Sequence, residues 1–164
     1  MSRAAALCLV AALAWSAGCR PRRVVRSPPH LGLEQAPSFG SLTLLQGFVP
    51  DPQGMTGIAG GPLRADGLGR RCRGWIQAEP GHVVRLQTPF EQLQVYVRSP
   101  LDTTLIVRLP DGRFVCDDDG GRGSNPRVVE SYWIPGDYRI WVGSQGPDQA
   151  GPYQVFFTEL PHDG

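Results

Sequence analysis

Apolar and polar residues alternate most clearly in the middle of the chain. In Leu93–Arg98 every second residue is Leu or Val, and the alternate positions, which include Tyr96, are expected to point outward. Thr103–Leu109 and Tyr138–Val142 repeat this alternation. A period of two residues is that of a β-strand with one buried face. These three segments are therefore the predicted centre of a β-sheet structure.

Shorter strands are predicted on both sides of this centre, because turn residues interrupt the chain about every ten positions. These further strands are expected within Ser38–Val49, Trp75–Ala78, Val83–Thr88, Arg113–Cys116, Val128–Trp133 and Tyr153–Phe157. The turns between strands include Pro110-Asp111-Gly112 and Pro135-Gly136-Asp137. About eight or nine short strands at this spacing predict an all-β fold, an antiparallel β-sandwich that is jelly-roll-like.

Composition supports short strands rather than helices. The 164 residues include 21 Gly and 16 Pro, and past Ser16 no window keeps apolar residues at helical spacing without one of them. Pro50–Arg71 is especially rich in Gly, Pro and Asp and lacks an apolar pattern. We expect it to be a long and partly mobile excursion between strands.

The first 18 residues have the pattern of a bacterial export signal. Arg3 precedes the apolar run Ala4–Trp15, which is too short to span a bilayer, and small residues follow up to Gly18. Because the next residue is Cys19, the segment resembles a lipobox, the signal for lipid attachment to a bacterial lipoprotein. Acyl chains on Cys19 would anchor the protein in a membrane. The alternative is simple cleavage by the ordinary signal peptidase near Ala17 or Gly18.

A lipid anchor would place the protein in the bacterial cell envelope. Inner-membrane retention is typically signalled by Asp after the lipidated cysteine, and this chain has Arg20 there, so we expect the outer membrane. Residues 19–37 contain Arg, Pro and scattered polar residues without periodicity, which predicts a flexible stalk. One β-sandwich domain would then occupy residues 38–164.

The four cysteines leave one pair in the mature chain on this interpretation. Cys8 would be removed with the export signal and Cys19 would be lipidated, so Cys72 and Cys116 would remain in an oxidising compartment. We expect these two to form a disulfide. Closing a loop of this length stabilises a fold by about 4 kcal/mol on the chain-entropy estimate. Two cysteines without a neighbouring His would make a poor metal site.

Charge is unevenly distributed along the chain. The formal net charge is +1, but five of the 16 basic residues, all of them Arg, lie in the first 26 positions. The rest of the chain has 11 Arg against 15 acidic residues, a net charge of −4. A mildly acidic body argues against nucleic-acid binding, which needs a basic surface. The Arg20–Arg26 cluster is either a solvated tether or a contact for anionic lipid headgroups.

Several short motifs stand in a distinctive order between Ser38 and Thr158. They are Cys72–Ile76, Ser99 with Asp102–Leu105, Pro110–Gly112, Cys116–Asp119, Asn125-Pro126, Gly136–Tyr138 and Trp141–Ser144. In order and spacing they resemble the bacterial pre-peptidase C-terminal, or PPC-like, domain family. The resemblance implies a jelly-roll-like β-sandwich that is non-catalytic. Such domains usually follow secreted proteases, which this chain does not have ahead of the module, and related modules of bacterial collagenases bind collagen and use calcium.

An acidic loop is the candidate metal site. Asp117, Asp118 and Asp119 are adjacent, and two Gly follow them. Calcium takes roughly six to eight oxygen ligands, and the three carboxylates together with Asn125 and Asp102 would supply several of them. Three like charges in a row repel one another, which a cation would relieve. The alternative is that Asp and Asn in a Gly-rich loop hydrogen-bond to their own backbone and stay solvated.

Two tryptophans are the candidate ligand contacts. Strand periodicity puts Trp141 on the face opposite Ile140, and Trp133 on the face opposite Tyr132. An exposed Trp on a sandwich face stacks on sugar rings or anchors a peptide. The alternatives are that long loops cover this outer face, or that a bulge shifts the strand parity.

The sequence contains no recognisable catalytic motif. Its three His residues do not fall in one, and His82 is expected to be a solvated turn residue. We therefore predict a non-catalytic lipoprotein that binds a protein or a polysaccharide, with calcium assisting. The alternative is a hydrolase, or a regulator of a separate secreted protease. An enzyme would need a cleft with converging polar groups, for example around Glu130 or Asp102.

Overall fold

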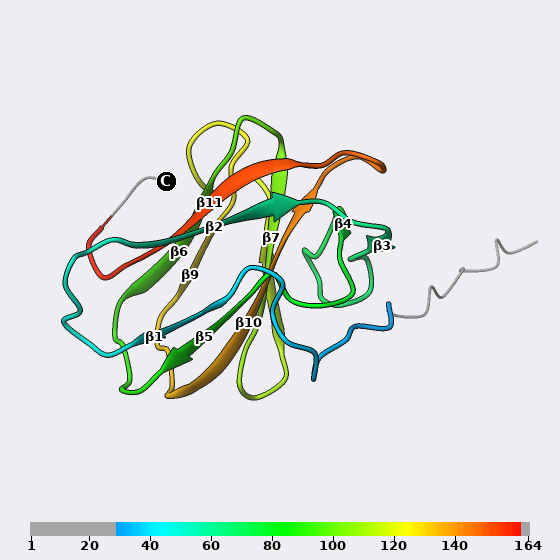
Figure 1. Cartoon of the computed structure of the whole chain (residues 1–164). Coiled ribbons are helices and arrows are strands. Elements are labelled where there is room, and N and C mark those ends of the chain that lie inside the picture. The colour runs from blue at the N-terminus through cyan, green and yellow to red at the C-terminus, as the bar shows by residue number, and fades with distance from the viewer. Residues whose placement is uncertain (1–28, 162–164) are drawn as a thin grey trace, which may run out of the picture.

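The computed structural model describes residues 29–161, and within this range the chain forms eleven β-strands in two sheets and no helix (Figure 1). The first sheet contains β1 (Ser41–Leu44), β3 (Leu63–Arg64), β4 (Trp75–Ile76), β5 (His82–Leu86), β7 (Thr103–Arg108), β8 (Phe114–Asp117) and β10 (Gly136–Ser144). The second sheet contains β2 (Gln53–Ala59), β6 (Leu93–Arg98), β9 (Arg127–Glu130) and β11 (Gly151–Thr158). The predicted all-β sandwich is confirmed.

The two sheets are built mainly from antiparallel pairs. The second sheet has the strand order β2-β11-β6-β9 and is antiparallel throughout. In the first sheet β10 is central, because β5 and β7 pair with its two edges and β4 pairs with its last residue. β8 pairs with β7, and β3 pairs with β4. β1 departs from the antiparallel prediction, since it runs parallel to β5.

The main core lies between the two sheets. Apolar side chains of β5, β7 and β10 meet those of β6, β9 and β11 there, which removes a large apolar area from water. The alternation predicted for β6 is confirmed, because Leu93, Val95 and Val97 are all buried in this core. Tyr96 is on the opposite face, as expected, yet it is only 2% exposed. The ring of Phe156 stacks on it with 5.1 Å between the ring centroids.

A second, smaller core covers the outer face of the first sheet. It contains Ile106 of β7, Trp141 of β10 and the cysteines Cys72 and Cys116. Partly buried apolar residues from the chain segments around it pack against this cluster, namely Leu31, Leu33, Leu63, Leu68 and Phe114. The first sheet is therefore buried on both faces in this region.

Part of the predicted flexible stalk packs on this second core. Leu31 and Leu33 contact it, and the Nε atom of Arg139 donates a hydrogen bond to the Leu33 carbonyl at 2.5 Å. Leu31 and Leu33, which lie in the predicted flexible stalk of residues 19–37, are therefore held against the first sheet. Contacts with distant strands hold this segment, although its own sequence has no periodicity.

β2 corrects the expectation that Pro50–Arg71 contains no strand. It pairs with β11 along its whole length. Its sequence lacks a regular alternation of apolar and polar residues, because Gly occupies positions where the aromatic rings of β11 lie close to its backbone. A Cβ atom on Gly54 would lie 3.0 Å from the ring of Phe156, and one on Gly57 would lie 2.5 Å from the Tyr153 hydroxyl. The neighbouring strand supplies the apolar volume that β2 itself lacks.

The predicted export signal, the lipidation site Cys19 and the first part of the stalk lie outside the described residues, as do residues 162–164. In the described part of the chain, no helix is long and apolar enough to cross a membrane.

Candidate functional site

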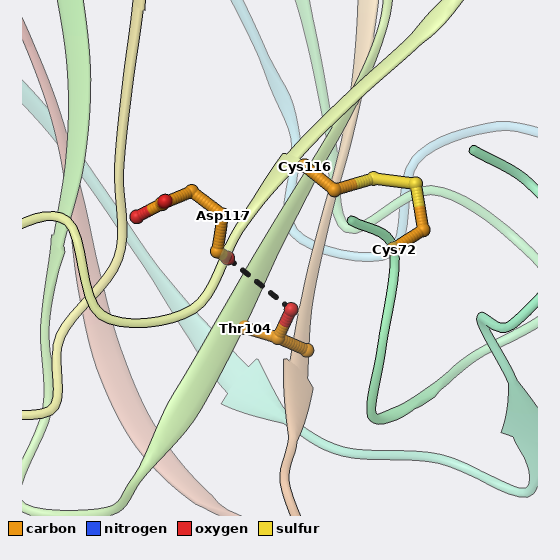
Figure 2. Close-up of a disulfide and its surroundings, with 4 residues drawn as sticks. All are labelled: Cys72, Thr104, Cys116 and Asp117. Atoms are coloured by element: carbon orange, nitrogen blue, oxygen red, sulfur yellow. Dashed lines mark hydrogen bonds between the residues drawn. A yellow bond between two sulfur atoms is a disulfide. The ribbon is translucent and has the colours of Figure 1, made fainter. Parts of the chain in front are cut away.

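The predicted disulfide is confirmed, and it joins the loop between β3 and β4 to strand β8. Cys72 and Cys116 are bonded and buried. Figure 2 shows that the next residue, Asp117, directs its carboxylate away from the disulfide, toward the acidic loop. The backbone carbonyl of Asp117 accepts a hydrogen bond from the Thr104 hydroxyl of β7 at 3.3 Å. β8 therefore separates a disulfide-linked loop from the acidic loop.

In the acidic loop, two of the predicted calcium ligands accept hydrogen bonds from backbone N–H groups. The Oδ2 atom of Asp117 accepts hydrogen bonds from the backbone N–H groups of Gly120 at 2.7 Å and Arg127 at 2.9 Å. The Oδ1 atom of Asn125 accepts one from the backbone N–H of Ser99 at 3.0 Å. These bonds fix the entry and exit of the loop, which is the self-capping alternative for Asp and Asn in such loops.

Asp102 lies close enough to Asp118 and Asp119 for their charges to act on it. Desolvation raises the pKa of Asp102 above its ordinary value, and the negative charges of Asp119 and Asp118 raise it further. Within residues 29–161, however, no three His, Cys, Asp or Glu side chains form a group that could hold a metal ion. Calcium binding at Asp102, Asp117, Asp118, Asp119 and Asn125 therefore stays a prediction, and Asp102, Asp118 and Asp119 are the carboxylates among them for which no backbone hydrogen bond is described.

Trp133 is not the exposed ligand contact that the sequence predicts, since it is only 2% exposed. β9 ends at Glu130, so Trp133 lies beyond the strand and the alternation of strand faces does not apply to it. Trp133 instead forms an isolated antiparallel bridge with Phe90. This bridge turns the indole into the main core, where it packs on Tyr138 with 5.1 Å between ring centroids.

Trp141 is also wrong as a ligand contact, for a different reason. It does lie on the face of β10 opposite Ile140, as predicted, but it is 1% exposed because the second core covers that face. The ring of Phe114 lies 6.3 Å away. The loop-covered alternative is therefore the correct one for Trp141.

His82 is buried rather than solvated. It is the first residue of β5, it is 0% exposed, and its Nε2 atom lies 2.8 Å from the Tyr153 hydroxyl. Desolvation lowers the pKa of His82 to about 4, against smaller opposing effects from the backbone of Phe39 and Gly40. This environment keeps the imidazole neutral at physiological pH.

A surface groove of about 560 Å³ lies over β2, β11 and the end of β6. Because Tyr153 and Val155 of β11 point into the core, Gln154 between them points outward. In the sheet register Gln154 lies between Thr56 of β2 and Arg98 of β6, so the three form one row across the groove.

The rest of the groove lining is largely apolar. Ile58 of β2 is 48% exposed and pairs with Pro152 of β11, and Pro100 and Phe39 also line the groove. Among the described residues that line it, none is a carboxylate, an imidazole or a thiol. The groove is therefore suited to contact and hydrogen bonding rather than to proton transfer.

Arg98 forms a rigid border of this groove. Its guanidinium carbon lies 5.4 Å from the ring centroids of both Tyr96 and Phe156, which stack on each other. Such cation–π contacts hold the side chain over the aromatic pair. The two rings are therefore covered, and the open surface lies on the side of Gln154.

Sequence reasoning missed the groove because it missed β2. The segment from Gln53 to Ala59 did contain a usable signal, since every residue in it is uncharged and Gly54 and Gly57 stand among larger side chains. Such a segment becomes recognisable as a strand only when an aromatic partner strand is known to lie beside it.

The chain is similar to an uncharacterized protein of Synechococcus elongatus. The two are 32% identical over 105 residues, which is 62% of this chain and 71% of the other protein. A comparison with models of known protein families finds no match. The PPC-like resemblance therefore stays a prediction.

Proposed function

Because this chain belongs to the same family as the uncharacterized protein of Synechococcus elongatus, which is a bacterial protein, we propose that it is a lipid-anchored binding module of the bacterial cell envelope. Its β-sandwich, which we interpret as PPC-like, holds a protein ligand without chemical change. The observation that carries this proposal is the groove over β2 and β11, which adjoins an uncharged edge strand.

β2 has the properties of a docking edge. It stands at the end of the order β2-β11-β6-β9, so one of its two edges has no strand partner in the described sheet. Natural sheet edges are commonly protected by charged residues or Pro, yet the seven residues of β2 include neither. An unpaired, uncharged edge accepts an extended peptide as an added strand, through main-chain hydrogen bonds.

The groove beside this edge supplies side-chain contacts for such a peptide. Ile58, Pro152 and Pro100 offer apolar surface, while Thr56 and Gln154 offer hydrogen-bonding groups. In strand addition the main chain provides affinity and pockets for alternate side chains provide specificity. Of the two ligand classes expected from the sequence, this arrangement favours a protein in extended conformation over a polysaccharide.

We propose that calcium binds at the acidic loop and assists ligand binding in the groove. Asp102, Asp118 and Asp119 carry mutually repelling charges, which a divalent cation would neutralise. Asn125 links this loop to Ser99, next to the groove residue Pro100. An ion in the loop would therefore stiffen one border of the groove.

The test selects extended peptides that bind the full-length protein from a random peptide library. We expect binders with micromolar affinity whose addition protects the backbone amides of β2 from hydrogen exchange. Thr56→Lys together with Ile58→Lys should weaken them at least tenfold, because it puts charge on an exposed edge. Thr43→Lys is the control, since it places Lys on an exposed position of β1, an edge strand of the first sheet.

Two results would contradict this assignment. Binders whose affinity is the same in the β2 double variant and in wild type would place recognition elsewhere. Protection of amides outside β2 and β11 would do the same. If the protein instead self-associates through β2, and the double variant abolishes this, then the ligand is a second copy of the chain.

A further inference from the structure

The loop of residues 65–74, between β3 and β4, is held rigidly against the first sheet. Its Cys72 is bonded to Cys116 of β8, and the backbone N–H of Ala65 donates to the Gly74 carbonyl at 3.0 Å, which closes the loop. Gly74 has a φ of +85°, and a Cβ atom there would collide with β7. Side chains that project from this loop therefore start from a fixed backbone, which lowers the entropy cost of binding a ligand.

A polar basin of about 490 Å³ opens beside this loop. Arg64, Arg70 and Arg73 line it, and Asp66 is the one acidic residue among the described lining residues. Arg64 donates a hydrogen bond to Asp66 at 2.5 Å. Arg70 and Arg73 are exposed and have no hydrogen-bond or ion-pair partner among residues 29–161. Two guanidinium groups without counter-charges concentrate positive potential in the basin.

The basin also has an apolar wall. Arg64 lies over the half-buried ring of Trp75, the first residue of β4, with 5.4 Å between its guanidinium carbon and the ring centroid, so the indole offers the basin only the surface that Arg64 leaves uncovered. The side chain of Gln145 lines the basin nearby. This combination differs from a site for a bare ion, which would need only the charges. An indole packs against the C–H face of a sugar ring, while the amide and Asp66 suit its hydroxyl groups.

We propose that this basin binds an anionic saccharide, a sugar unit that carries a carboxylate or a phosphate group. Arg70 and Arg73 would hold the anionic group, since a guanidinium matches both groups with paired hydrogen bonds. Trp75 would support the ring. The basin shares no residue with the peptide groove, so this site is additional to the proposed protein-binding function.

The experiment is calorimetric titration of the full-length protein with defined probes. Trigalacturonic acid represents the carboxylate form and glucose 6-phosphate the phosphate form. Maltotriose is the neutral sugar, and inorganic phosphate is the anion without a sugar. We expect at least one charged sugar to bind at least tenfold more tightly than both maltotriose and inorganic phosphate, and the tighter of the two identifies the anionic group. Raising the salt concentration should weaken this binding.

Matched variants localise the site. Arg70→Gln with Arg73→Gln should reduce affinity for the charged sugar at least tenfold, without changing thermal stability, because both side chains are exposed. Arg113→Gln with Arg122→Gln removes the same charge elsewhere on the surface and should leave affinity within twofold. Equal loss in both double variants, equal binding of maltotriose or phosphate, or no binding of any charged sugar would each overturn the proposal. A failure of peptide binding at β2 would not affect it.

Discussion

At the scale of single residues, two glycines make room for one buried polar pair. The Tyr153 hydroxyl reaches His82 between Gly57 and Gly81, where a Cβ atom would lie 2.5 Å and 2.9 Å from it. The ring of Phe39 packs against both members of this pair and is perpendicular to the ring of Tyr153. Burial raises the pKa of Tyr153 and lowers that of His82 to about 4. A side chain at either glycine would therefore open a water-free site.

This pair predicts a loss of stability in mild acid. The unfolded chain binds a proton at His82 near the ordinary histidine pKa of 6.5, whereas the folded protein binds it only near pH 4. The contribution to stability is therefore fully present above pH 6.5 and is lost as the pH falls toward 4. Between pH 7.5 and pH 5 we expect the free energy of unfolding to drop by about 1 to 2 kcal/mol.

Urea denaturation at a series of pH values checks this expectation. His82→Gln keeps a group that can bond to Tyr153 but does not titrate, so its stability should vary less over this range than that of wild type. His30→Gln serves as the control, because His30 is exposed. Identical pH profiles for wild type and His82→Gln would show that the imidazole is not responsible.

At the scale of elements, the acidic loop combines a capped backbone with unneutralised charge. Asp117 and Asn125 hold the loop backbone through hydrogen bonds. Desolvation and the negative charges of Asp119 and Asp118 raise the pKa of Asp102. The backbone of the loop is therefore held in place without a metal ion, and a bound cation would still stabilise it by neutralising these charges.

We expect 10 mM calcium to raise the melting temperature by about 3 °C, as for a site of roughly millimolar affinity. Asp102→Asn with Asp119→Asn should abolish this shift, whereas the exposed Asp148→Asn should retain it. Differential scanning calorimetry with calcium or chelator measures both. A shift of the same size in the double variant would exclude these carboxylates as ligands. Asp117→Asn should lower stability with or without calcium, because it weakens two backbone hydrogen bonds.

A strand could be predicted from the sequence when its own side chains supply the apolar residues of the core, and not when a neighbouring strand supplies them. β6 carries its own alternating Leu and Val residues, and its inward face was predictable from the sequence. β2 was not, because the aromatic rings of β11 fill the space above its glycines. The same reason explains why the groove, which depends on β2, had no local sequence signal.

At the scale of the whole molecule, the two surface depressions described above differ in polarity and charge. The groove over β2 and β11 is largely apolar, whereas the basin beside the disulfide-linked loop is rich in Arg. A net charge of −4 beyond the first 26 residues conceals this local positive region. The segment from Arg64 to Trp75 contains four Arg, a Cys and a Trp. This local cluster of Arg indicates the basic basin, which the net charge of the chain does not reveal.

The proposed membrane anchor makes its own prediction for the intact protein. Cys19→Ala should lose labelling by radioactive palmitate and move from the membrane to the soluble fraction, because acyl chains provide the anchoring energy. Cys8→Ala is the matched control and should stay in the membrane, since we expect Cys8 to leave with the export signal. Fractionation of bacteria that express each variant tests this. A membrane-bound Cys19→Ala protein would refute the lipoprotein assignment.

The sequence by itself determined the positions of most strands and turns, the inward face of the central strands, and the pairing of Cys72 with Cys116. It could do so because strand periodicity and turn chemistry are local properties. Only the tertiary structure decided that Trp141 and His82 are buried and that β2 is a strand. Periodicity specifies which face a side chain takes, but the segments that cover that face come from distant parts of the chain.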